Sequence, residues 1–136
     1  MIFARFGEGQ DRERSTALMT ASRDGDGFSG IEKIHTSPTP LRLSNPAISP
    51  DGKLIVATAR AGGKPQLFYS RKTKGGSWQA FQLLPTPINT PDFGQFAAYI
   101  ANDGKTLYFS SARPAKGAGD DNIYRALLPA EVMGRH

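Results

Sequence analysis

Apolar residues along this chain come in short runs that are bounded by glycine, proline, asparagine or aspartate. Runs of this length, rich in β-branched and aromatic residues, are typical of β-strands. No apolar pattern at helical spacing continues for three turns without a glycine or a proline. The pattern therefore predicts an all-β fold. The expected strands cover residues 15–22, 53–58, 66–70, 77–84, 95–100, 105–110 and 122–128.

Two stretches of the chain repeat the same order of features. ISPDGKLIVATAR covers residues 48–60, and IANDGKTLYFSSAR covers residues 100–113. In each copy an Asp–Gly pair, Asp51-Gly52 or Asp103-Gly104, stands before a strand-like run. Asp–Gly is typical of a tight turn, because the aspartate bonds nearby main chain and the glycine accepts a positive φ. We therefore expect these four residues to be structural turn residues and not a catalytic carboxylate pair.

Each copy extends into a small antiparallel sheet. The best-defined unit has strands over 45–49, 53–59, 66–72 and 77–84, joined by the Asp–Gly turn and two glycine-rich corners. Four antiparallel strands in about 40 residues are the size of one β-propeller blade. The unit before it is degenerate. Its expected strands cover 2–6, 15–22, 30–35 and a short piece at 41–44.

The fold class that follows is all-β and β-propeller-like, with about three stacked four-stranded antiparallel blades in one domain over residues 1–136. The expected parts are a degenerate blade over about 1–44, a blade over about 45–94, a blade over about 95–128 and a tail over 129–136.

Three segments carry a resemblance to a known repeat. NPAISPDGKLIVATAR, GGSWQAFQLLPTPINTP and DGKTLYFSSARPAKGAGDDNIYRALL resemble the PD40 repeat, the WD40-like β-propeller repeat of the TolB-like propeller family. The resemblance covers residues 45–128 well and 15–44 loosely. It implies a periplasmic or cell-envelope setting and binding to partner proteins, including peptidoglycan-associated lipoproteins. The first residues lack the basic head and apolar middle of a signal peptide, so an envelope location requires a removed presequence or a longer parent. Without the resemblance, a cytoplasmic location is expected.

The number of blades leaves three arrangements open. Propellers usually close with at least four blades, and an open arc exposes an apolar blade face and unpaired strand edges. The chain is therefore expected to be part of a longer propeller, to complete a ring as a homodimer, or to stand as an open stack.

Composition excludes several classes of function. The chain has 17 Lys and Arg against 12 Asp and Glu, a net charge of +5, but the basic residues are scattered apart from Arg71, Lys72 and Lys74. A nucleic-acid surface would need them gathered on one face. No run approaches the roughly 20 apolar residues of a membrane helix. The absence of cysteine excludes disulfides, thiol nucleophiles and Cys-based zinc sites.

No pattern for catalysis, metal or cofactor binding appears in the sequence. The two histidines, His35 and His136, have no catalytic partner nearby in sequence. Asp24 and Asp26 alternate as in a calcium loop, but the twelfth position of that loop holds His35 in place of glutamate. We expect a non-enzymatic chain without cofactor or metal.

Loop and strand-end residues are the binding candidates, because loops carry function more often than strands. A ligand or partner rim is expected at Arg60, Asn89, Asp92, Phe93 and Arg113, with Trp78 as an aromatic contact for a small ligand or glycan. The other aromatic residues of the last two units, Tyr99 and Tyr108 among them, are also binding candidates, but packing between blades is the favoured expectation for each of them.

The function that we predict is a non-catalytic scaffold that binds a protein or ligand. Two alternatives stay open: a propeller portion of a hydrolase, either a prolyl-oligopeptidase-like peptidase or a glycan-processing enzyme, and a sugar-binding propeller.

Overall fold

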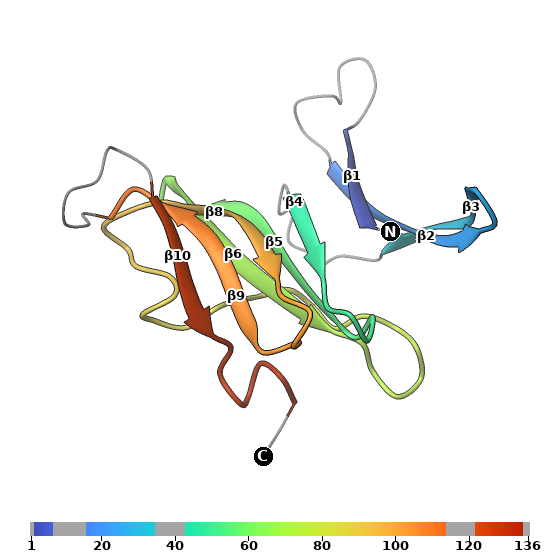
Figure 1. The fold of residues 1–136 in the computed structure, drawn as a ribbon. Coiled ribbons are helices and arrows are strands. Elements are labelled where there is room, and N and C mark those ends of the chain that lie inside the picture. Colours follow the sequence, from blue (N-terminus) through green and yellow to red (C-terminus); the bar gives the residue numbers. More distant parts are fainter. Residues whose placement is uncertain (1, 7–15, 35–42, 114–121, 135–136) are drawn as a thin grey trace.

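The computed structural model describes residues 2–6, 16–34, 43–113 and 122–134, and these residues form ten strands without a helix (Figure 1). The strands are β1 (Ile2–Phe6), β2 (Thr16–Asp24), β3 (Gly27–Ile34), β4 (Ser44–Ile48), β5 (Leu54–Ala61), β6 (Lys64–Arg71), β7 (Gln82–Leu83), β8 (Gln95–Ile100), β9 (Thr106–Ser111) and β10 (Asn122–Leu127). The all-β prediction is confirmed. None of the residues placed by the structure forms a helix that could cross a membrane.

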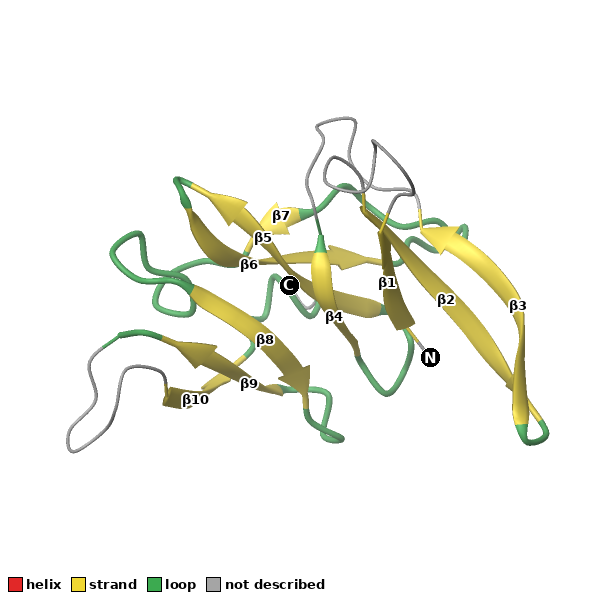
Figure 2. Ribbon diagram, turned by 90° about the horizontal axis from the view of Figure 1, so that it is seen from above, coloured by secondary structure: helices red, strands yellow, loops and turns green. Residues whose placement is uncertain are grey.

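The strands form three antiparallel sheets that follow chain order. The first sheet has the order β1-β2-β3, the central sheet β4-β5-β6-β7, and the third sheet β8-β9-β10. The first strands of neighbouring sheets contact each other, β1 with β4 and β4 with β8 (Figure 2). Three stacked meanders of this kind fit a partial propeller. Of the sheets described, only the central one has the four strands of the predicted blade.

One expected strand, 77–84, is much shorter in the structure than predicted, although it takes its expected place beside β6. The run 77–84 forms only the short β7 and an isolated bridge between Trp78 and Lys72. The reason is local: the Ser70 hydroxyl donates to the Gln79 carbonyl at 2.5 Å and so replaces a main-chain partner. The expected strand 41–44 lies partly outside the described residues. Leu43 is in no strand, and Ser44 begins β4.

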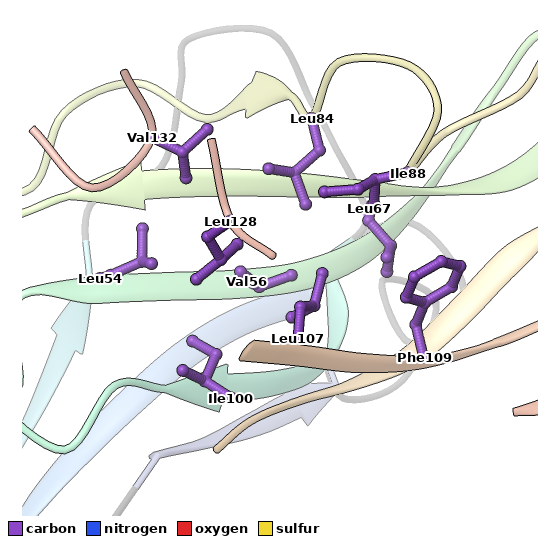
Figure 3. Packing of buried hydrophobic residues seen from close by; sticks show 10 residues of the cluster. All are labelled: Leu54, Val56, Leu67, Leu84, Ile88, Ile100, Leu107, Phe109, Leu128 and Val132. Atoms are coloured by element: carbon purple, nitrogen blue, oxygen red, sulfur yellow. The ribbon is translucent and has the colours of Figure 1, made fainter. Parts of the chain in front are cut away.

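The central sheet is buried on both faces. Leu54 to Ala59 are all buried because successive side chains of β5 enter two different cores. Val56 packs with Leu107 in the core between the central and third sheets, which Figure 3 shows. Ile55 packs with Leu18 in the core between the first and central sheets. Burial on both faces is the feature expected of a middle blade.

Candidate binding surface

The two Asp–Gly turns share two hydrogen bonds. The glycine N–H donates to the carbonyl of Ser49 in the first turn and of Ala101 in the second, at 2.9 Å in both. The aspartate Oδ1 accepts from the N–H of the lysine two residues on, at 3.0 Å for Asp51 and 2.8 Å for Asp103. Both turns line one hollow of about 280 Å³ at one end of the sheets.

Both carboxylates are occupied by the turns themselves. The Ser49 hydroxyl donates to Asp51, and this bond lowers the pKa of the Asp51 carboxyl from its ordinary value of 3.8. The Thr106 hydroxyl donates to Asp103 at 2.7 Å and lowers the pKa of that carboxyl in the same way. Acceptors held in this manner by main-chain and hydroxyl donors are a means of fixing a turn.

These bonds predict an acid-sensitive stability. Because the folded-state pKa values lie below 3.8, the unfolded chain binds these protons more tightly. The stabilisation is therefore complete above the ordinary pKa and is lost as the pH falls through the folded-state pKa. We expect the double variant Asp51→Asn, Asp103→Asn to lose less stability than the parent between about pH 5 and pH 2. Urea unfolding at each pH measures this, and parallel profiles for variant and parent would contradict it.

The turn glycines predict a second stability effect. Gly104 has a φ of 69°, and a Cβ added there would meet no atom within 4 Å. A β-branched side chain at this φ is strained by its own backbone, which costs about 1–3 kcal/mol. We expect Gly104→Val to lower the free energy of unfolding by this amount.

Gly75→Val is the control for this effect, because Gly75 is also a turn glycine but has no positive φ. Equal melting of the two variants would contradict the prediction.

Four of the six predicted rim residues lie at the opposite end of β5, around the loop 85–94 and the β5–β6 corner. The corner and the loop are tied together: Lys64 donates to the carbonyl of Asp92 at 2.9 Å, and Gln66 donates to the carbonyl of Phe93 at 3.1 Å. Arg60 is exposed and donates to the corner carbonyl of Gly63 at 2.8 Å. Asp92 is exposed and Phe93 is half-buried. A largely apolar groove of about 400 Å³ lies between this corner and the loop.

Asn89 lies in the same loop but is buried. Its Nδ2 donates to the carbonyls of Leu67 and Leu84 at 2.7 and 2.8 Å, and its Oδ1 accepts from the N–H of Leu67 at 2.8 Å. The amide therefore uses both of its ends to hold the loop on β6. A bound ligand would have to compete with these bonds. Asn89 therefore holds the loop in place and does not face a ligand.

Arg113 also joins parts of the chain. Its guanidinium donates to the carbonyls of Pro87 and Ile88 at 2.8 and 2.6 Å, and to the Ser111 hydroxyl at 3.0 Å. It also lies 5.3 Å from the ring centres of both Phe109 and Tyr124. With its donors directed at main-chain carbonyls, Arg113 clamps the loop 85–94 to the third sheet.

Trp78 lies apart from the rim. It packs against the core between the first and central sheets, and the Lys72 ammonium lies 5.9 Å from its ring centre. Trp78 is half-buried, which leaves a smaller face for stacking on a sugar than a fully exposed ring would offer.

The structure reveals a surface that the rim hypothesis missed. Of six exposed large hydrophobic side chains among the described residues, four lie on the third sheet. They are Tyr99 (57% exposed), Tyr108 (36%), Ile123 (78%) and Leu127 (75%). The expectation that Tyr99 and Tyr108 pack between blades is wrong for the sheets described, because no further sheet covers this side.

These four side chains share one face of the sheet. Tyr99 pairs with Tyr108, and Tyr108 pairs with Arg125. Ile123 and Leu127 lie opposite Ser110 and Thr106, which alternate with Tyr108 on the same side of β9. The opposite side carries the buried Leu107 and Phe109. We call this exposed side of the β8–β10 sheet the outer face.

The sequence held a signal for the outer face. Tyr108 is the counterpart of Val56 in the repeat. Its neighbours in the strand, Leu107 and Phe109, are both apolar. The alternation around Tyr108 could have placed it on the side away from the central sheet. The repeat does not indicate whether another sheet packs against the far side of the third sheet.

No protein-family model matches this chain, and no curated protein matches it. Among solved structures, the chain is similar to TolB from Acinetobacter baumannii, with 23% sequence identity over 82% of this chain and a TM-score of 0.48. The chain spans about a quarter (26%) of the length of that TolB chain. Membership of the PD40 family stays a prediction.

Proposed function

We propose that this chain is a non-catalytic scaffold that binds protein through the outer face of the β8–β10 sheet. The observation that carries the proposal is the clustering of Tyr99, Tyr108, Ile123 and Leu127 on one side of one sheet. Contiguous exposed apolar patches on soluble domains mark interaction sites.

The chemistry of the outer face suits a protein surface. Tyrosine offers a large apolar ring together with a hydroxyl that can stay hydrated, which is why it is enriched at interfaces. Arg125 lies beside Tyr108 on the neighbouring strand and is exposed. Tyrosine and arginine are two of the residue types enriched at interface hot spots.

Photo-crosslinking tests the proposal. A benzophenone amino acid at position 108 is expected to crosslink to protein in cells that produce the chain, whereas the same group in place of Lys74 is not. Lys74 is a suitable control because it is exposed on a corner of the central sheet. Absence of a crosslink at 108, or equal yields at both positions, would overturn the proposal.

The cell-envelope location is proposed on the PD40-like motifs alone, and cell fractionation tests it. The hydrolase and sugar-binding alternatives stay predictions, since the groove beside Leu83 and Pro91 carries no feature specific to either.

A further inference from the structure

Within the chain, each sheet turns the same side toward the preceding sheet. In β5, Ile55 packs into the core shared with the first sheet, and Val56 packs into the core shared with the third. In β9, Leu107 occupies the repeat position of Ile55 and packs back toward the central sheet. β2, β5 and β9 are the second strands of their sheets. We call the side of each that faces the preceding sheet the backward side, and the side that faces the following sheet the forward side.

The outer face is the forward side of the last sheet. Tyr99 and Tyr108 pair across β8 and β9 just as Ala47 and Val56 pair across β4 and β5. In the central sheet this row is covered by the third sheet, and Val56 is fully buried. The repeat thus indicates what covers the outer face: the backward side of another sheet of this kind.

The first sheet of a second copy offers such a side. In β2, Leu18 is fully buried toward the central sheet. Met19, its neighbour in the strand, therefore lies on the backward side together with its cross-strand partner Lys33. Lys33 is exposed and Met19 is half-buried. In the part of the chain that the structure describes, the backward sides of the other two sheets are already covered.

We infer that the outer face of the β8–β10 sheet binds the β1–β3 sheet of a second copy of this chain. The inference rests on the proposed function, because it names the partner of the same face. A pair of copies related by a twofold axis makes this contact twice, so each copy covers the open end of the other. The pair is then closed and does not extend into a filament.

The net charge predicts how this pairing responds to salt. Each copy carries +5, so two copies repel each other while their apolar faces attract. Salt screens the repulsion and is expected to strengthen the pairing. A partner held by acidic groups around Arg125 would show the opposite salt dependence.

Sedimentation equilibrium of the full chain tests the stoichiometry. The expected mass is twice 14.7 kDa, and it should shift to the single-copy mass in Tyr108→Glu, with a dissociation constant raised at least about tenfold as for a hot-spot residue. The new glutamate lies opposite Arg125, so it disfavours the interface without a like-charge pair in the sheet. Leu83→Glu, at another exposed leucine, is the matched control and should leave the mass unchanged. Circular dichroism checks that both variants fold.

Crosslinking tests the orientation, since the chain has no cysteine of its own. Lys33→Cys and Ser110→Cys each place one thiol on the two faces proposed to meet. A short bis-maleimide added to an equimolar mixture is expected to join the two variants to each other. Lys74→Cys mixed with Ser110→Cys is the control and should give no mixed product.

The outcomes separate this inference from the proposed function. A single-copy mass at all concentrations, with the crosslink from position 108 directed to a different protein, would overturn the second copy and keep the binding function. A single-copy mass without any crosslink from 108 would overturn both. Exclusive Ser110→Cys self-crosslinks would overturn the head-to-tail contact.

Discussion

Replacing Asn89 with alanine is expected to lower the free energy of unfolding by about 2–4 kcal/mol. The side chain is buried and supplies the partner for the Leu67 N–H and for the Leu84 carbonyl. Alanine leaves both of these buried groups without that partner, and each unsatisfied group costs about 1–3 kcal/mol. Urea unfolding followed by circular dichroism measures the difference.

Asn102→Ala serves as the control because Asn102 is exposed in the second Asp–Gly turn. Its free energy of unfolding is expected to change by less than about 0.5 kcal/mol, as for surface substitutions in general. If Asn89→Ala were equally harmless, the three hydrogen bonds would not hold the loop, and the assignment of Asn89 as a ligand-facing rim residue would return.

Asn89 also shows where sequence reasoning stops. A polar residue in a proline-rich loop reads as a surface group, because loops run over the surface. Its partner Leu67 is 22 residues away in the chain, and no local pattern indicates that contact. The same holds for Arg113, whose acceptors Pro87 and Ile88 lie in another loop. Long-range clamps of this kind become visible only when the sheets are placed.

The turns were predictable for the opposite reason. Each Asp–Gly turn is determined by about six consecutive residues, so its sequence contains almost all of its hydrogen-bonding partners. β8 was predicted with its observed bounds, Gln95–Ile100, because turn residues delimit it on both sides. The run 77–84 also alternates and was misread, since the Ser70 hydroxyl takes up a carbonyl that a regular strand would pair.

Burial of the aromatic residues depends on the number of sheets, which is a global property. Tyr108 and Val56 occupy the same position of the repeat, yet Val56 is covered and Tyr108 is exposed. Position in the repeat therefore predicts which side a residue faces. Whether that side is buried depends on whether another sheet packs against it, either from the same chain or from a second copy.

The interface between the central and third sheets gives the second large effect. Leu107 is fully buried there, among Val56, Ile100 and Leu128 (Figure 3). Truncating a buried leucine removes its transfer free energy and leaves a cavity, which costs about 2–5 kcal/mol. We expect this loss of stability for Leu107→Ala, measured by urea unfolding.

Leu83→Ala is the control, because the same atoms are removed from a side chain that is half exposed on the short β7. Its loss should be well under half of that for Leu107→Ala, since less apolar surface returns to water. The difference between the two leucine variants tests whether the third sheet packs on the central sheet. If the third sheet packed elsewhere, Leu107 would be as solvated as Tyr108 is on the opposite side of β9, and the two leucine variants would unfold alike. A difference of several kcal/mol in the expected direction would mean that the two sheets are held together by the side of β9 that faces the central sheet, which leaves the outer face free for a partner.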